Sequence, residues 1–403
     1  MKKNKIKYLL AISVLVIFVV ACNDYVSNVE PLITQAQDNL LNSETQVPFL
    51  AAGVKQQFAN VASQLAMETD LLSDQVIYTN DIPTASFPQF EEIDKGLILT
   101  NNTSVTNVSL AIGPLRFYAD DLVRRIGTIT FTNTAIQNDG LFTGYLYGGY
   151  ARYLLAVSFG LNQNQPGNCI DAGPFIAQTD LLNQAIDKLK SALTVTSKAT
   201  DTRIVNSLIA KAYLAKKDYI NAAIYAALGM AKGDADFNAV YSSTSQVWWW
   251  GYAGNGRVQA AVNSRFNDYI TADANEANRI KIKTVKGTSG ATYYYQIKYP
   301  NQDSPMPVMT WQENNLMLAE LILRGNATGN ALALVNDVRA SHSIAALTAI
   351  TTDGVLVERD KELFCQGTRL MDQNRTGNWH LAAGTWHYLP IPDRERLANK
   401  NLQ

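Results

Sequence analysis

The stretch VNSLIAKAYLAKKDYINAAIYAALGMAK, residues 205–232, predicts two helices joined by a tight polar turn. In its second half, apolar residues recur at i, i+3, i+4 and i+7, which gives one narrow apolar face. Asp218 precedes this face and is a residue type that caps helix N-termini, so it predicts where the second helix begins. The face contains small residues, and another helix can therefore approach it closely. It is formed by Tyr219, Ala222, Ala223, Ala226, Ala227 and Met230.

The spacing of small residues in this stretch resembles the tetratricopeptide repeat. Ala210, Tyr213, Ala222 and Gly229 are separated by three, nine and seven residues, as that repeat requires. The Trp and Pro of the full consensus are absent. The recurrence of these offsets favours a repeated helix pair over two unrelated antiparallel pairs. They recur at Ala319, Ile322, Ala331 and Val338.

Apolar periodicity elsewhere extends this pattern to a whole scaffold. Proline and polar residues predict a long irregular loop over residues 79–107, with the next helix at 110–126, and a second loop over residues 161–179. Residues 234–309 break the helical rhythm and predict an irregular insert with a short strand pair. The fold class is therefore mostly α, with a tetratricopeptide-like scaffold and a partly β subregion in one domain, residues 47–403. The four helix pairs are expected at about residues 47–126, 144–195, 203–232 and 313–341.

The first 21 residues have the organisation of a bacterial signal peptide. Four lysines precede an apolar run over residues 8–21, which is shorter than the roughly 20 residues of a membrane-spanning helix. The run ends VVAC at Cys22, the shape of a lipobox. We expect cleavage before Cys22, its acylation by chains such as palmitate, and a tether over residues 22–46. The alternative is an ordinary signal peptide followed by a chance cysteine.

Charge and cysteine content limit the partners and the cysteine chemistry that the chain can have. The chain has 34 basic and 35 acidic residues, and removal of the four signal-peptide lysines leaves 30 basic residues and a net charge of −5. An acidic chain without a basic stripe argues against nucleic acid as a partner. Cys169 and Cys365 then remain as thiols. Both a disulfide between them and two buried free thiols are compatible with the sequence.

A segment near the C-terminus resembles a known family. Residues 355–377 read VLVERDKELFCQGTRLMDQNRTG and predict a helix that ends near Gly367, followed by a bend. This segment is similar to the late motif of the RagB/SusD family of surface lipoproteins in Bacteroidetes-type bacteria. Gln366 stands where the family usually has an acidic residue, and Gln373 where it has an apolar one. The matching residues are Glu358-Arg359, Glu362-Leu363, Gly367-Thr368-Arg369, Asp372 and Arg375-Thr376-Gly377.

Other segments resemble the family in the same order along nearly the whole mature chain. They are the lipobox, the helix with Tyr150-Ala151-Arg152, the last repeat with Ala319-Glu320, and Pro390-Ile391-Pro392 near the end. The resemblance implies an outer-membrane surface lipoprotein that binds oligosaccharide or polysaccharide and delivers it to a SusC-like TonB-dependent transporter. It implies binding without bond cleavage and no cofactor. Capture of peptides is the alternative within the family.

Two alternatives lie outside the family. A surface glycoside hydrolase would use two carboxylates, and Glu358, Glu362 and Asp372 are the densest acidic cluster. Interleaved arginines favour a buried ion-pair lattice for this cluster instead. A scaffold that binds only other proteins is the second alternative. The sequence contains no nucleophile elbow, phosphate-binding loop or zinc motif, and no histidine spacing that indicates a metal site.

Aromatic residues in the irregular segments are the predicted ligand contacts. Indole and phenol rings offer flat apolar faces to the C–H faces of sugars. In an extended strand, Trp248 and Trp250 would point to one side and Trp249 to the other. The alternative is that these rings fill the core between scaffold and insert. The predicted contacts are Trp248, Trp249, Trp250, Tyr252, Phe87, Phe90, Tyr293 and Tyr295.

Overall fold

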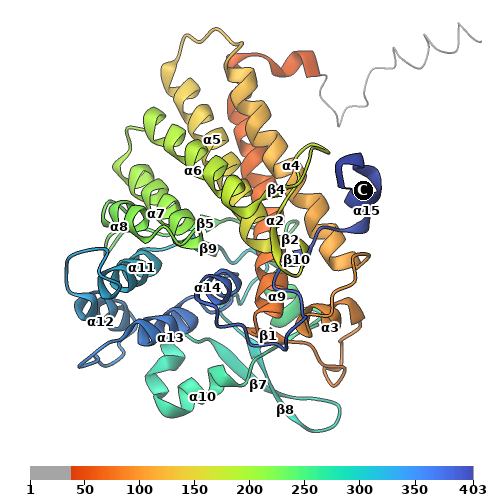
Figure 1. Ribbon diagram of the computed structural model, residues 1–403, viewed down its shortest axis with the longest axis vertical. Coiled ribbons are helices and arrows are strands. Elements are labelled where there is room, and N and C mark those ends of the chain that lie inside the picture. Colours follow the sequence, from red (N-terminus) through yellow and green to blue (C-terminus); the bar gives the residue numbers. More distant parts are fainter. Residues whose placement is uncertain (1–37, 403) are drawn as a thin grey trace, which may run out of the picture.

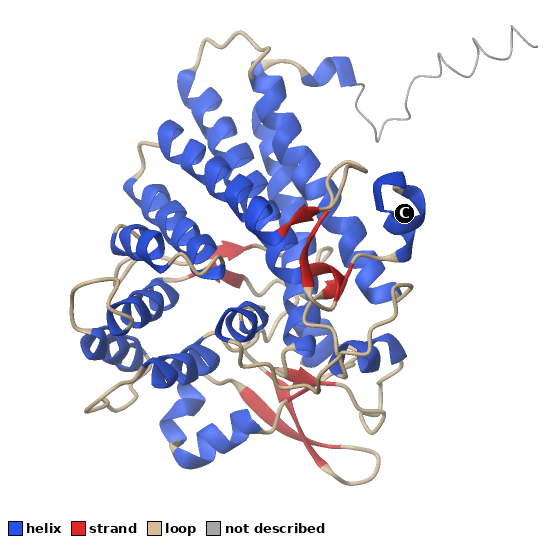
Figure 2. Ribbon diagram, viewed as in Figure 1, coloured by secondary structure: helices blue, strands red, loops and turns tan. Residues whose placement is uncertain are grey.

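The structure is a computed structural model that describes residues 38–402 (Figure 1). The predicted signal peptide and Cys22 lie outside the described residues. Helices dominate the fold, and short strands lie among them and at one end of the molecule (Figure 2). No helix in the described part of the chain is both long enough and apolar enough to cross a membrane.

Eight helices form four pairs that follow one another across the molecule in chain order (Figure 1). Each helix packs against its partner, and each pair packs against the next. This arrangement confirms the predicted fold class, a mostly helical scaffold of tetratricopeptide-like pairs. The pairs are α2 (Val47–Leu72) with α4 (Thr103–Ile126), α5 (Thr134–Ser158) with α6 (Gln178–Val195), α7 (Ala199–Ala215) with α8 (Tyr219–Ala227), and α11 (Trp311–Leu323) with α12 (Ala331–Ser341).

Close approach explains the small residue at Gly229, which lies just after α8. A Cβ atom there would come within 2.4 Å of the Ser207 Oγ and 2.5 Å of the Asn314 Oδ1. Ser207 of α7 accepts a hydrogen bond from the Met230 N–H and donates one to Asn314 of α11. Asp218 accepts a hydrogen bond from the Asn221 N–H, which confirms it as the cap of α8. One glycine therefore allows three helices to interlock.

The two predicted loops contain regular structure. Helix α3 (Pro88–Asp94) lies inside residues 79–107, and α4 begins at Thr103 rather than at residue 110. Proline is tolerated at the first turn of a helix, so Pro88 starts α3 instead of breaking it. The second loop and the residues just before it form three strands, β2 (Phe159–Asn162), β3 (Gln165–Asn168) and β4 (Ile176–Ala177). A C-terminal strand, β10 (Leu389–Pro390), pairs parallel to β2 in the same sheet.

The insert between α8 and α11 combines short strands and helices. The predicted strand pair is confirmed as β7 (Ile282–Lys286) and β8 (Thr292–Gln296), which pair antiparallel in one sheet with β6 (Ala261–Val262) and β1 (Val76–Ile77). Trp248 begins a helix, so the expectation of an extended strand there is wrong. The other elements are β5 (Phe237–Ala239) paired with β9 (Met306–Met309), α9 (Trp248–Ala253) and α10 (Arg265–Ala272). Short 3-10 helices lie at Asp38–Leu41, Glu44–Gln46, Ala274–Asn278 and Lys400–Leu402.

The C-terminal motif forms α13 (Thr352–Glu362) and α14 (Arg369–Thr376), and α15 (Asp393–Ala398) follows near the end. The first helix ends at Glu362, five residues before the position predicted from sequence. Gly367 lies in the bend with φ 70°, and a Cβ atom there would come within 2.6 Å of the Ala66 Cα on α2. Its N–H donates a hydrogen bond to Asp70. The bend is therefore placed by close contact with the first scaffold helix.

Candidate functional site

The charged residues of the C-terminal motif are bound to one another and to the scaffold. Arg375 donates two hydrogen bonds of 2.6 Å to the carboxylate of Glu320 on α11, and both side chains are buried. Asp372 lies 2.8 Å from Arg375 and 2.8 Å from Arg359. Arg369 bonds Asp74, which follows α2. These contacts fasten α14 to the first and last helix pairs.

A second group of buried ion pairs fastens α13. Arg279 lies 2.7 Å from Glu358 and 2.7 Å from Glu276. Arg339 of α12 lies 2.8 Å from the other oxygen of Glu358. Arg279 also lies 3.5 Å from Glu362, which is bonded in addition by His342 at 3.0 Å. Glu358, Glu362 and Asp372, the acidic cluster predicted from sequence, thus each have a cationic partner.

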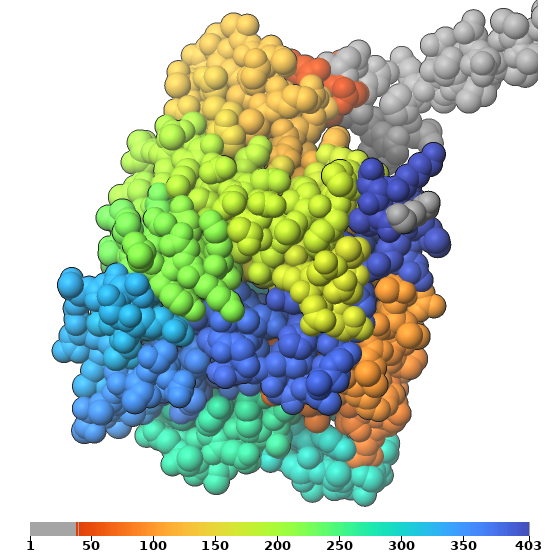
Figure 3. All heavy atoms as spheres, in the orientation of Figure 1, coloured from red at the N-terminus to blue at the C-terminus, as the bar shows by residue number. Residues whose placement is uncertain are grey.

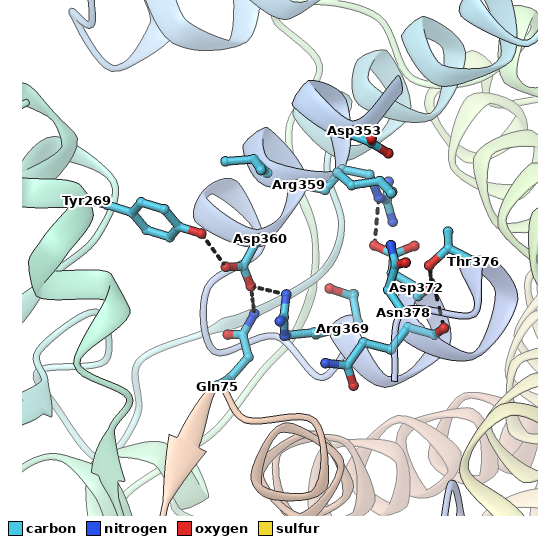
Figure 4. A pocket seen from close by; sticks show the side chains of 13 residues that line it. Gln75, Tyr269, Asp353, Arg359, Asp360, Arg369, Asp372, Thr376 and Asn378 are labelled. Atoms are coloured by element: carbon cyan, nitrogen blue, oxygen red, sulfur yellow. Dashed lines mark hydrogen bonds and ion pairs between the residues drawn. The ribbon is translucent and has the colours of Figure 1, made fainter. Parts of the chain in front are cut away.

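A cavity of about 270 Å³ lies between α13 and α14 (Figure 4). Figure 4 shows Asp360 facing Tyr269, Arg369 and Gln75, each of which donates it a hydrogen bond. Burial opposes ionisation of Asp372, but Arg359 and Arg375 outweigh it and lower its pKa to about 2. Burial is likewise outweighed at Asp360, whose pKa is lowered by Arg265 and Arg369. A general acid in glycoside hydrolysis requires the opposite shift.

Carboxyl groups with raised pKa values lie elsewhere. Burial raises the pKa of Glu68 and of Asp70 on α2 to about 8 in each case. Glu68 accepts a hydrogen bond from Gln64, and both acids are fully buried. Neither lines the cavity between α13 and α14. Among the described residues, no three His, Cys, Asp or Glu side chains are grouped to hold a metal ion.

Three of the predicted aromatic residues meet on one surface, which we call the aromatic platform: Phe87, Trp248 and Tyr252. The Trp248 and Tyr252 ring centroids are 4.5 Å apart, one helical turn along α9. The Phe87 ring lies 5.6 Å from that of Tyr252 and joins from the residue before α3. All three rings are partly exposed. Residues more than 150 positions apart in the sequence therefore form one surface.

Two other predicted contacts lie in the core instead. Trp249 and Phe90 are both 0% exposed, so neither ring can stack on a ligand, and the prediction is wrong for them. Trp249 stacks on Tyr299 at 6.3 Å, and its carbonyl accepts a hydrogen bond from Gln296. Phe90 lies on the buried side of α3, edge-on to Phe87. Of these two rings, Phe90 contacts the aromatic platform, through Phe87.

The remaining predicted contacts are partly buried. Tyr293 and Tyr295 lie on one face of β8 and pack beside a small apolar cluster that includes Ile82 and Val258. Trp250 packs against the main core and is half-buried. The structure does not place these three rings in contact with the aromatic platform.

The structure places cationic side chains beside these rings, which was not predicted from the sequence. The guanidinium of Arg257 lies 5.8 Å from the centre of the Phe87 ring and donates a hydrogen bond to Ser86. Lys283 of β7 lies 6.0 Å from the Tyr295 ring and donates to Asn255. A single basic residue in an irregular segment carries no periodic signal. The positions of Arg257 and Lys283 beside aromatic rings therefore could not be predicted from the sequence.

Comparison by structure finds close likeness where comparison by sequence finds none. No protein-family profile and no curated protein matches the sequence. A SusD superfamily protein from Bacteroides thetaiotaomicron aligns over 90% of this chain and 99% of its own, with a TM-score of 0.74 and 15% identity. A putative sugar binding protein from Bacteroides vulgatus aligns over 89% and 97%, with a TM-score of 0.71 and 16% identity.

A third solved structure contains a ligand. It is surface glycan-binding protein A from Bacteroides thetaiotaomicron in complex with laminarihexaose. It aligns over 90% of this chain and 99% of its own, with a TM-score of 0.69 and 14% identity. Likeness over almost the whole of both chains identifies the architecture. The chain has the SusD-like fold.

Proposed function

We propose that this protein is a RagB/SusD-family surface lipoprotein that captures oligosaccharide at the outer membrane and passes it to a SusC-like TonB-dependent transporter. The aromatic platform is the observation that carries the proposal. Its three rings are partly exposed and lie on α9 and just before α3, beside the cationic Arg257. Sugar rings bind to such surfaces through their C–H faces, while their hydroxyl groups bond nearby polar side chains.

The solved structures that share this fold support carbohydrate as the ligand class. One is described as a laminarin-binding SusD-like protein and another holds laminarihexaose. Because identity to them is only 14–15%, the ligand of this chain has to be measured. Binding without cleavage is supported by the ion pairs of the acidic cluster, which keep Asp372 and Asp360 ionised.

The membrane anchor is the second part of the proposal. It rests on the lipobox that ends at Cys22 in the sequence. Cys22→Ala is expected to release the protein from the membrane fraction, and mass spectrometry of the wild type is expected to find an acylated Cys22. An unmodified Cys22 in membrane-bound protein would contradict the anchor.

One purification tests capture and delivery together. Protein extracted from membranes in mild detergent should co-purify with a large outer-membrane barrel. The purified chain should bind at least one member of a panel of defined hexasaccharides of glucose, xylose and mannose, without releasing reducing sugar. Affinity in the micromolar to millimolar range is expected, because a delivery protein must release its ligand. Binding of peptides but no glycan would favour the peptide-capturing alternative, and turnover lost in Glu358→Gln would favour a hydrolase.

A further inference from the structure

A second cavity, of about 420 Å³, lies beside the middle of α4 and away from the aromatic platform. Its walls come from α4, Leu155 of α5, the end of β3 with the loop that follows, and Glu395 of α15, and it shares no residue with the platform. In Figure 3, segments coloured orange, yellow and dark blue, those of α4, the β3 region and the C-terminus, meet at one side of the molecule. The volume lies in the range of ordinary small-molecule sites.

Two aromatic rings stand at the edge of this cavity. Phe117 is 51% exposed and Tyr118 is 47% exposed, although both lie on a scaffold helix. Their ring centroids are 6.1 Å apart and their planes are inclined by 65°. Large apolar side chains of a scaffold helix usually face the core, as Leu115 does beside them. Two adjacent rings therefore offer exposed apolar faces at the edge of this cavity.

The opposite wall supplies hydrogen-bonding groups. Asn168 is buried with 4% exposure, and its Oδ1 accepts a hydrogen bond from the Cys169 N–H. Asp171 is ion-paired with the buried Arg116, which fixes an exposed carboxylate at the cavity. Glu395 adds a second carboxylate. Aromatic faces opposite carboxylate and amide oxygens are the combination that binds a polyhydroxylated ring.

The Cys169 thiol in this wall is not activated as a nucleophile. Burial and the neighbouring Glu395 raise the pKa of Cys169 to about 12. Its Sγ lies 3.2 Å from a Glu395 oxygen, to which the S–H donates. Cys169 and Cys365 are both free of disulfides. A protonated thiol is a weak nucleophile, so the arrangement favours a binding site.

We infer that this cavity is a second carbohydrate site, in which Phe117 and Tyr118 stack on sugar rings and Asp171 and Asn168 bond their hydroxyl groups. The inference rests on the proposed function and deepens it, because two sites on one chain would hold a long polysaccharide by two points. Two linked contacts strengthen binding of a polymer far more than of a short oligosaccharide, which can occupy only one site at a time.

Titration calorimetry with the hexasaccharide panel tests this inference on the purified chain. Wild type is expected to bind two hexasaccharides per chain, and Phe117→Ala and Tyr118→Ala are each expected to remove one. The parent polysaccharide should bind either variant roughly tenfold or more weakly, as measured by affinity electrophoresis. Phe49→Ala is the matched control, because Phe49 is 72% exposed on α2 and lines neither site. Thermal melting verifies that each variant is folded.

The outcomes separate this inference from the proposed function. One hexasaccharide per chain, lost in Trp248→Ala and unchanged in both α4 variants, would overturn the second site and leave the aromatic platform in place. One hexasaccharide lost in the α4 variants and unchanged in Trp248→Ala would support the α4 cavity and contradict the platform. Absence of binding to every hexasaccharide and its polysaccharide would overturn both.

Discussion

Replacing Arg375 with Met should destabilise the protein by about 3–5 kcal/mol, the usual cost of removing one partner of a buried ion pair. The substitution deletes two 2.6 Å hydrogen bonds to Glu320 and one 2.8 Å contact to Asp372. Glu320 is 0% exposed and keeps only Arg324, at 2.8 Å. Most of the loss arises because Glu320 then remains buried with two of its three hydrogen bonds missing.

Urea unfolding at pH 7 measures this loss of unfolding free energy. Two further variants show where the loss comes from. Arg394→Met, at an exposed arginine of α15, is the control and should change the free energy of unfolding by less than about 0.5 kcal/mol. Combining Arg375→Met with Glu320→Met removes the buried charge and should recover part of the loss. A loss below about 1 kcal/mol in Arg375→Met would refute the reasoning, since that is the range of exposed pairs.

Two further predictions concern close packing and pH. Gly229→Ala should lower the free energy of unfolding by about 1–3 kcal/mol, because the new methyl group meets Ser207 and Asn314. An unchanged melting temperature would argue against the close approach of these residues. The raised pKa of Glu68, about 8, means that folding favours its protonated form, so its contribution to stability is complete below pH 4.5 and is lost as pH rises toward 8. Glu68→Gln should therefore be more stable relative to wild type at pH 8 than at pH 5, and a difference independent of pH between these values would contradict the shift.

The helical scaffold could be predicted because its signal is local and repeats. The seven-residue spacing between Ala222 and Gly229 recurs between Ala331 and Val338. The structure places these two sets of residues in neighbouring helix pairs. Each pair must bury one narrow face, so the pattern survives in the sequence. Helix α3 was not predicted because it has only seven residues, too few for a periodic signal, and because Pro88 and its polar surroundings were interpreted as a loop.

The candidate site was predictable by residue type and not by geometry. Three consecutive tryptophans suit a strand by propensity, but burial of Trp249 against Tyr299 accompanies a helix instead. The helix brings the Trp248 and Tyr252 rings into contact, because the two residues lie one turn apart. Alternation along a strand would place both rings on one face but would not bring them into contact. Phe87 joins them only through tertiary structure. Phe117 and Tyr118 lay within an ordinary helical pattern, so their exposure was invisible in the sequence.

The most direct test of the proposed function is the affinity of Trp248→Ala for the hexasaccharide that wild type binds best. Trp248 is partly exposed and also packs against the main core, so truncating it lowers stability to some extent. Its backbone N–H, which holds the start of α9 to Ser63 at 3.0 Å, is retained, and thermal melting beside the Phe49→Ala control verifies that the variant is folded. The aromatic platform predicts that this variant loses roughly tenfold or more in affinity for the platform site. Unchanged affinity and stoichiometry in a folded Trp248→Ala protein would contradict it.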